Sequence, residues 1–347
     1  MIVIGAGVAG LACARELDRR GRKSVVLERS RGLGGRCATR RVDGQAVDHG
    51  IAFLHARSAE FAEALAELPA AGRIDGWPQR VVETRLACQP EAFAGAQRRM
   101  ARREGVSVFP KHLAKDLDVR LEHRVTHLES QAGRVRAHTQ GGEVFESEFV
   151  VVAGSVAQSL RLVEPFAAGF PGAAAQFARL HELEVVPSFV VIAGYAKQSP
   201  DPGFDLWNPL ETVMLQAIVH DSTKRLDPQW RVLVLHSRPG FARAHLAEPA
   251  ESWSRDMLWE LGEMLGSWAA EPVWLQTHTW RSGRVRASDQ LTMPAVLNAP
   301  GGGTVLVIGD GFGTEQGLEG AYLSGVAAGE QLARAPGAPP LRAAESR

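Results

Sequence analysis

The sequence predicts an α/β protein in which a discontinuous domain with a parallel sheet carries an inserted domain with an antiparallel sheet and a packed helix. Three observations support this fold class. Residues 2–27 read as strand, glycine turn, helix and strand; residues 189–280 contain strand-like runs separated by loops; and residues 304–333 read as a buried strand followed by a helix. A βαβ pattern that resumes after a strand-rich middle indicates an insertion into a parallel-sheet domain.

The expected elements follow from hydrophobic periodicity and turn residues. The first domain should begin with a strand at 2–4, a helix at 11–20, a strand at 24–27 and an ordered loop at 31–50. Helices at 58–67 and 90–104 should follow, and then short strands between 118 and 152 with a turn at 140–142. The end of the chain should add a strand at 304–308 and a helix at 318–333. Four arginines at helical spacing should form a solvated face of the helix at 90–104: Arg98, Arg99, Arg102 and Arg103. The inserted domain should contain strands at 189–194, 212–219, 232–236 and 273–280 and a helix at 251–268.

These elements set the expected domain boundaries. The first domain should comprise residues 1–75, 95–158 and 299–335, and the inserted domain residues 76–94 and 159–298. Residues 336–347 are rich in Ala, Pro and Arg, have little to pack, and are expected to be disordered.

Composition and charge favour a protein that acts on small molecules. The 347 residues carry 39 basic and 39 acidic side chains, so no net charge attracts nucleic acid or an anionic membrane. The odd set of Cys13, Cys37 and Cys88 lacks the spacing of disulfide or metal frameworks, which suits a reducing cytoplasm. No secretory signal is evident, and no apolar stretch reaches the roughly 20 residues that span a bilayer. We expect a cytoplasmic protein that is a monomer or a weak homodimer.

The first glycine turn carries a dinucleotide-binding fingerprint. Gly5, Gly7 and Gly10 stand between a strand and a helix, where they allow a tight turn, close approach of a pyrophosphate and close helix packing. Glu28 ends the second strand, where a carboxylate can accept hydrogen bonds from ribose hydroxyls. The spacing predicts a Rossmann-like domain that holds either NAD or FAD.

A second glycine turn separates these two cofactors. The segment 31–39 places Gly34, Gly35 and Arg36 after the second strand, with the arginine available to neutralise phosphate. This pattern resembles the GG motif of the large FAD family that contains the amine oxidases, and an ordinary NAD dehydrogenase has no such loop. We therefore expect FAD.

The end of the chain supplies a third cofactor element. Gly309 and Asp310 follow a buried strand, so Asp310 is placed to bind ribityl hydroxyls or to meet the pyrophosphate. Residues 317–321 open a helix, whose free N–H groups and positive dipole end would stabilise negative charge on a reduced flavin. The residues expected to bind the cofactor are Gly5, Gly7, Ala9, Gly10, Glu28, Arg29, Gly34, Gly35, Arg36, Asp48, His49, Gly50, Val125, Gly309, Asp310, Gly317, Leu318, Glu319 and Ala321.

Six segments along the whole chain resemble renalase and its bacterial relatives. They are Arg-Cys-Ala-Thr-Arg-Arg at 36–41, Val-Asp-His-Gly at 47–50, Val-His-Asp-Ser-Thr-Lys-Arg at 219–225, Leu-His-Ser at 235–237, Thr-Trp-Arg at 279–281 and Leu-Glu-Gly-Ala-Tyr-Leu-Ser-Gly at 318–325. The chain departs from that family at Ile51-Ala52-Phe53, where Gln and an aromatic residue are usual, and at Arg225, where Pro-Gly is typical.

This resemblance implies a non-covalently bound FAD and an oxidase reaction. Its substrates would be isomers of NAD(P)H, with hydride transfer to flavin N5 and reoxidation by molecular oxygen to hydrogen peroxide. Such a transfer leaves an aromatic pyridinium and needs no proton abstraction, so positioning and desolvation suffice. No catalytic base and no metal site are expected. The substrate-pocket candidates are His49 and Trp280, at the junction of the two domains, whereas His220, His236 and His278 are expected as ordinary sheet residues.

Two alternatives stay open at this point. One is a flavin amine oxidase or desaturase that acts on another small molecule. Many members of that group keep a lysine beside the flavin, and the candidate strand at 273–280 has none. The other alternative is a protein that binds FAD without turnover.

Overall fold

The computed structural model describes residues 1–85, 87, 90–94, 98–168, 170, 172–286 and 289–335. The chain forms two compact units. Unit 1 comprises residues 1–37, 109–185 and 284–347, and unit 2 comprises residues 38–108 and 186–283. Residues 38–75 and 98–108 therefore belong to unit 2, and residues 159–185 and 289–298 belong to unit 1, whereas the sequence-based boundaries had grouped them the other way.

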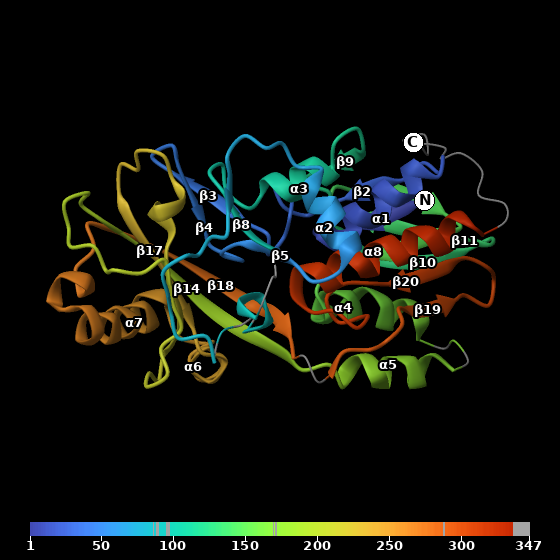
Figure 1. Cartoon of the computed structure of the whole chain (residues 1–347). Coiled ribbons are helices and arrows are strands. Elements are labelled where there is room, and N and C mark those ends of the chain that lie inside the picture. The colour runs from blue at the N-terminus through green and yellow to red at the C-terminus, as the bar shows by residue number, and fades with distance from the viewer. Residues whose placement is uncertain are drawn as a thin grey trace. The chain divides into compact units, whose positions relative to one another are not determined.

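Unit 1 contains a six-stranded sheet, as the βαβ pattern predicted. Its strand order is β19 (Ala295–Asn298), β20 (Thr304–Val307), β13 (Phe149–Val152), β1 (Ile2–Ile4), β2 (Val25–Leu27) and β9 (Asp118–Arg120). All neighbours are parallel except β19 and β20. Helices α1 (Val8–Arg19) and α8 (Gly317–Ala333), which are far apart in sequence, pack side by side (Figure 1). The predicted α/β class with a Rossmann-like sheet is confirmed.

The remaining elements of unit 1 surround this sheet. They are the antiparallel strands β10 (Val125–Gln131), β11 (Arg134–Thr139) and β12 (Val144–Ser147) and the helices α3 (Val108–Leu113), α4 (Val156–Ala167) and α5 (Ala173–His181). The turn between β11 and β12 is closed by a hydrogen bond from Gly142 N to Thr139 O, where a hairpin was expected. Apolar side chains of β1, β2, β13 and β20 form one core with those of β10, β11 and α4.

Unit 2 is built on a second six-stranded sheet. The strand order is β18 (Trp274–Val285), β14 (Val185–Tyr195), β17 (Arg231–Ser237), β16 (Leu215–His220), β15 (Leu206–Trp207) and β7 (Val81–Val82). Alternate residues of a strand point to opposite faces. On one face, apolar residues of β14 and β17 pack against α6 (Pro239–Ala244) and α7 (Ala250–Leu265). On the other face they pack against Val47, Phe53 and Trp77 of the segment 38–108.

The segment predicted as an ordered loop at 31–50 contains a β-hairpin instead. Strands β3 (Thr39–Val42) and β4 (Gln45–Asp48) pair around Asp43 and Gly44, whose φ angles are 48° and 82°. Asp-Gly is a strong signal for a two-residue hairpin turn, because both central residues need positive φ. The Asp-Gly pair was visible in the sequence, but the many arginines and glycines around it favoured the interpretation as a loop.

The helix predicted at 90–104 is wrong over its second half. The described part of this segment forms a short 3-10 helix at Pro90–Phe93 and strand β8 (Arg98–Arg102), which pairs with β5 (Leu54–Ala56) and β6 (Arg73–Asp75). Arg102 is not solvated: its side chain is 1% exposed and donates hydrogen bonds to the carbonyls of Pro69 and Ala71. Sheet pairing and these carbonyl partners outweighed the helical spacing of the arginines.

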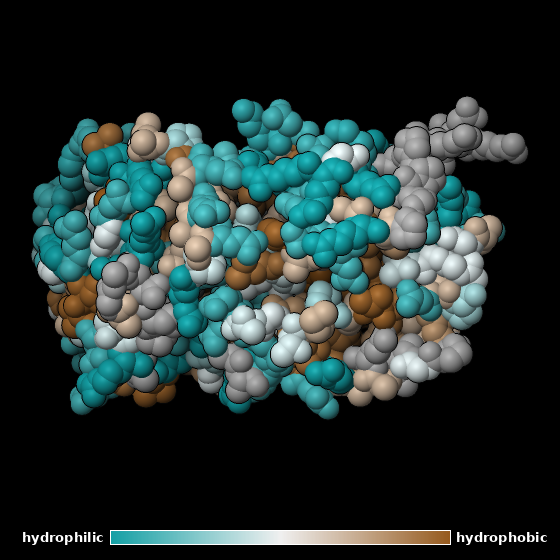
Figure 2. Space-filling model, turned by 45° about the vertical axis from the view of Figure 1, so that its right-hand side comes forward, coloured by the Kyte–Doolittle hydropathy of each residue, from teal (hydrophilic) through white to brown (hydrophobic). Residues whose placement is uncertain are grey.

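The surface drawn in Figure 2 is largely hydrophilic, with smaller hydrophobic patches between the polar side chains. No helix in the described ranges is long and apolar enough to cross a membrane.

Helix α2 (Ala59–Ala66) matches the helix predicted at 58–67, with Ser58 as its N-cap. Cys88 and the tail at 336–347 lie outside the described residues.

Candidate functional site

The glycine turn after β1 forms the first part of the candidate cofactor site in unit 1. Gly5 has φ of +107°, and its N–H donates to Leu27 O at 2.8 Å, which ties the turn to β2. A Cβ on Gly10 would lie 2.0 Å from Gly5 O, so only glycine allows α1 to start this close to the strand. Nothing lies within 4 Å of a Cβ built on Gly7, so the turn leaves open space beside the helix start.

The start of α1 is suited to an anionic group. Gly7 is the N-cap and provides no side-chain cap, and no acidic residue lies in the first turn of the helix. The unpaired first-turn N–H groups and the positive end of the helix dipole therefore remain available for phosphate. Together with the open space at Gly7, this donor set fits the pyrophosphate of a dinucleotide.

Glu28 lies directly after β2, beside this turn. Its Oε2 accepts a hydrogen bond from Ala6 N at 2.7 Å, and its Oε1 accepts one from Ser30 N at 2.8 Å. Each carboxylate oxygen keeps acceptor capacity for a further partner. The backbone thus fixes the carboxylate in an orientation from which it can bind ribose hydroxyls. Arg29, the next residue, is exposed.

The two glycine turns lie against each other. Gly34 N donates to Ala6 O at 2.8 Å, and Gly7 and Gly34 form a parallel bridge. A Cβ on Gly35 would lie 3.7 Å from Gly7 Cα. The sequence prediction that a second glycine turn stands beside the first is borne out geometrically. Both turns therefore border the same open space at the start of α1.

Arg36 and Asp310 were expected to act separately on the cofactor, but they form an ion pair. Arg36 donates from both terminal nitrogens to the Asp310 carboxylate, at 2.6 and 2.7 Å. Burial alone would raise the pKa of Asp310, but the charge and hydrogen bonds of Arg36 outweigh it and leave this pKa below the ordinary value. The Arg36 side chain is 30% exposed and that of Asp310 is 6% exposed, so Arg36 is the more accessible partner of the pair.

The third predicted cofactor element, the start of α8, adjoins this pair. Gln290 bridges the two by donating from Nε2 to Asp310 O at 2.9 Å and to Glu315 O at 2.8 Å. Gln316 is the N-cap of α8, and its side chain does not cap the N–H groups of the described helix. Unit 1 thus holds the glycine turns, Glu28, Arg36, Asp310 and the start of α8 in one compact unit. Val125 also lies in unit 1 and is 8% exposed.

Asp48, His49 and Gly50, by contrast, belong to unit 2. The Asp48 side chain is part of a buried ion network, which we call the Asp48 network and which consists of Asp48, Asp221, Lys224 and Arg225. Lys224 Nζ lies 2.6 Å from a carboxylate oxygen of each aspartate, and all three side chains are 0% exposed. Sequence reasoning assigned Asp48 to the cofactor, whereas its carboxylate is occupied by these cations.

The Asp48 network also fixes the backbone around it. The Asp48 carboxylate accepts hydrogen bonds from Thr39 Oγ1 at 2.7 Å and from Val106 N at 2.9 Å. Lys224 Nζ donates to Ala52 O at 3.0 Å, which anchors the segment that departs from the resembled family. Burial would raise the pKa of Asp48, but the nearby Lys224 and Arg225 hold it below its ordinary value. Hydrogen bonds from the segment 219–225 therefore fix the position of residues 48–52.

His49 and Trp280, the two substrate-pocket candidates, are in direct contact. Their rings stack with centroids 5.7 Å apart and an interplanar angle of 19°, and Trp280 Nε1 donates to His49 O at 3.1 Å. His278 lies edge-on to His49 at 5.2 Å and contacts Trp280 at 4.1 Å. The structure thus brings a third ring to this aromatic cluster, which sequence reasoning treated as an ordinary sheet residue.

His49 is held neutral at physiological pH. Burial, followed by the charges of Arg40, His278 and His236, lowers its pKa from 6.5 to about 3. Its side chain is mostly buried, and Nδ1 makes no hydrogen bond to any residue in the described ranges. This nitrogen is therefore available to form a hydrogen bond with a ligand or a water molecule.

The lowered pKa of His49 predicts a pH-dependent stability. Between pH 6.5 and 3 the unfolded chain binds a proton at this position and the folded chain does not, so stability falls as the pH drops below 6.5. We expect His49 to contribute a loss of about 2 kcal/mol between pH 7.5 and 5. Urea unfolding at both pH values should show a smaller pH effect in His49→Gln than in the wild type. Equal pH effects in both proteins would contradict the assignment.

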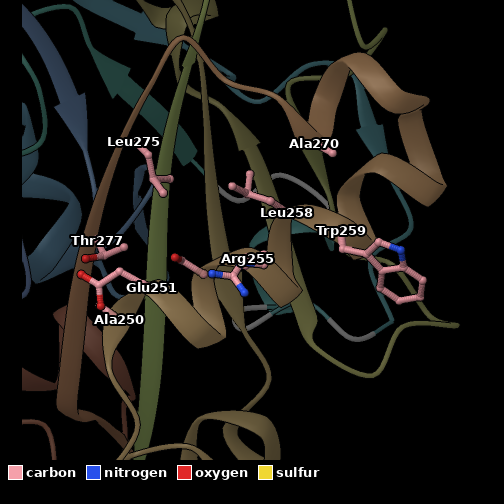
Figure 3. Close-up of a pocket in the computed structure, with 9 residues that line it drawn as sticks. Ala250, Glu251, Arg255, Leu258, Trp259, Ala270, Leu275 and Thr277 are labelled. Atoms are coloured by element: carbon pink, nitrogen blue, oxygen red, sulfur yellow. The ribbon is translucent and has the colours of Figure 1, made fainter.

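A groove lies on the face of strand β18 that is opposite to the face carrying His278 and Trp280. Leu275 and Thr277 of β18 line it together with α7 residues such as Leu258 and Trp259, and its volume is about 480 Å³ (Figure 3). Alternation along β18 turns these two residues away from the face that carries His278 and Trp280. None of the predicted site residues borders this groove, so it is separate from the aromatic cluster.

Comparisons with known protein families place the chain in context. Residues 83–333, more than half of the chain, match the family described as "Flavin containing amine oxidoreductase". Residues 3–68 match the "NAD(P)-binding Rossmann-like domain". The second match covers the first glycine turn, Glu28 and the second glycine turn.

Several proteins that the chain resembles are named as oxidoreductases. Pseudooxynicotine dehydrogenase of a Pseudomonas species is 48% identical over 54 residues, which are 16% of this chain and 11% of that protein. The chain resembles the structure of a putrescine oxidase variant with a TM-score of 0.67 at 16% identity, covering 96% of this chain and 98% of the other. It resembles cyclohexylamine oxidase from Brevibacterium oxydans with a TM-score of 0.66 at 15% identity, covering 96% and 99%. At such identities the likeness concerns the fold.

Proposed function

Because the chain belongs to the flavin containing amine oxidoreductase family and is an FAD-dependent oxidoreductase, we propose that it oxidises a small dihydronicotinamide compound in the manner of renalase. The substrate class would be isomers of NAD(P)H. The stacked pair of His49 and Trp280 is the observation that carries this proposal, because two nearly parallel rings form a flat apolar wall for a planar substrate.

The residues of unit 1 would hold the cofactor. Glu28 would accept hydrogen bonds from the adenosine ribose, and the first turn of α1 would bind the pyrophosphate in the space beside Gly7. Arg36, with its charge balanced by Asp310, would lie beside the phosphates, and the start of α8 would stabilise negative charge. Bound FAD would supply a hydride acceptor, and the electron pair and proton of that hydride, together with one further proton from solvent, would reduce oxygen to hydrogen peroxide.

The residues of unit 2 would position the substrate. A dihydronicotinamide loses a hydride and becomes an aromatic pyridinium without losing a proton to the protein, so the site needs no general base. His49 suits such a site, because its neutral imidazole stacks and forms hydrogen bonds without removing a proton. Trp280 would exclude water from one face of the ring.

Amine oxidation is the second candidate, since the family and several similar structures are named for amines. Two observations favour the first candidate over it. Strand β18 carries no lysine, and Lys224, the one buried lysine among the described residues of unit 2, is engaged with Asp48 and Asp221. Arg40, whose charge acts on His49, would also repel an alkylammonium substrate.

Oxygen consumption by the purified FAD-loaded enzyme tests the proposal. NADH isomers, prepared by borohydride reduction of NAD, should drive oxygen uptake with formation of NAD and equimolar peroxide, and pure NADH should not. Putrescine and cyclohexylamine should give no uptake. Oxygen uptake with an amine and none with the isomers would replace the first candidate by the second.

A further inference from the structure

A basic side chain, Arg40, lies beside the aromatic cluster. Strands β3 and β4 pair Arg40 with Val47, and His49 N donates to Ala38 O at 3.2 Å. Because residues 38 and 40 point to the same face of the hairpin, Arg40 and His49 lie on one face. Arg40 also donates to Gln276 Oε1 at 2.9 Å, which places it over β18.

The same face of β18 continues from this contact to the aromatic cluster. Gln276, His278 and Trp280 alternate along the strand, so all three point to the side that carries Arg40 and His49. The hairpin therefore presents Arg40 over the first of these residues and His49 over the other two. Arg40 and the cluster form one continuous lining.

Cationic and neutral groups dominate this lining. Four groups act electrostatically on the pKa of His49: Arg40, His278 and His236 lower it, and Asp48 raises it. The Asp48 carboxylate is already paired with Lys224 in the Asp48 network. Burial and the charge of Arg40 also lower the pKa of His278. At neutral pH the lining therefore has the fixed positive charge of Arg40 and the neutral imidazoles of His49 and His278.

The lining also contains an unused polar atom. His49 is 7% exposed, and its Nδ1 has no hydrogen-bond partner among the described residues. The described polar partner of Arg40 is a neutral amide oxygen, and no ion pair joins this half-buried positive charge to a carboxylate among the described residues. Burying a charge without a counter-ion is costly, and a bound anion would remove this cost.

We infer that Arg40 and His49 form a subsite for an anionic group of the substrate, and that this group is a phosphate. The inference rests on the proposed function, because it assigns the part of a dihydronicotinamide nucleotide that lies next to the stacked ring. A guanidinium offers paired N–H donors that match phosphate oxygens, and a neutral imidazole adds one more donor. Arg40 thereby selects a nucleotide over the free base or an amine.

Binding of two oxidised ligands to the FAD-loaded enzyme tests this subsite without any turnover. Nicotinamide mononucleotide carries the phosphate and nicotinamide riboside lacks it. Calorimetric titration should show that the wild type binds the mononucleotide more tightly by about 10- to 100-fold, the range for a charge-assisted contact. Inorganic phosphate should compete with the mononucleotide.

Three variants make the assignment specific. Arg40→Gln should bind both ligands equally, and Arg40→Lys should regain part of the preference because it keeps the charge. Arg41→Gln is the matched control: Arg41 lies on the other face of the same strand and donates to Glu104 O, so its loss should leave the preference unchanged. Thermal melting of each variant checks that the fold is intact.

The outcomes separate this inference from the proposed function. A phosphate preference that depends on Arg40, in an enzyme that oxidises no dihydronicotinamide, would overturn the proposed function and retain the subsite. Turnover of the isomers combined with equal affinities for the two ligands, or with no effect of Arg40→Gln, would overturn the subsite alone. Absence of mononucleotide binding would also overturn it.

Discussion

Replacing Lys224 by methionine is expected to lower the free energy of unfolding by about 3–5 kcal/mol, the cost of removing one partner from a buried ion pair. Lys224 is 0% exposed and lies 2.6 Å from both Asp48 and Asp221. Without it, two buried carboxylates would share the single guanidinium of Arg225, and Ala52 O would lose its donor. Urea unfolding of wild type and variant, both with FAD removed, measures the loss.

An exposed lysine provides the matched control. Lys197 forms an ion pair with Asp227, and the two side chains are 63% and 90% exposed. Lys197→Met should therefore change stability by less than about 1 kcal/mol. If Lys224→Met were as mild as the control, the Asp48 network would not stabilise unit 2 and could not anchor residues 48–52.

The second large effect concerns the cofactor. Glu28→Ala should weaken FAD binding by at least about 100-fold, since charged hydrogen bonds to ribose hydroxyls contribute about 1.5–3 kcal/mol each. The change also removes the acceptor for Ala6 N and Ser30 N, which loosens the glycine turn. Flavin fluorescence released on ultrafiltration, or titration of the apoprotein with FAD, measures the affinity.

Asp18 supplies a control for this experiment. Its carboxylate pairs with Lys23 at the exposed end of α1, away from the glycine turn. Asp18→Ala should retain FAD with wild-type affinity. Retention of FAD by Glu28→Ala as well would show that the adenosine ribose is held by other groups.

The strand, glycine turn and helix at the start of unit 1 were predictable because their signals are local. Gly5, Gly10 and Glu28 occupy a strand, turn and helix that follow one another directly, and each position has a steric or hydrogen-bonding reason that can be read from spacing. The pairing of Arg36 with Asp310 was missed, since 274 positions separate them and only the parallel sheet brings them together.

The side-chain contacts of unit 2 were less predictable because they are long-range. The histidine and tryptophan candidates were identified, but Arg40 and Lys224 were not, since their roles depend on the hairpin at 39–48 and on burial that composition does not reveal. The Asp43-Gly44 turn could have predicted the hairpin. Recognising it would have placed Arg40 and His49 on one face from the sequence alone.

Anaerobic mixing of the FAD-loaded enzyme with isomerised NADH tests the central proposal most directly. Flavin absorbance near 450 nm should bleach rapidly with the isomer fraction and not with pure NADH, and admission of air should restore it with formation of peroxide. Failure of the isomers to bleach the flavin, together with rapid bleaching by an amine such as putrescine, would contradict the proposed function and assign the enzyme to amine oxidation.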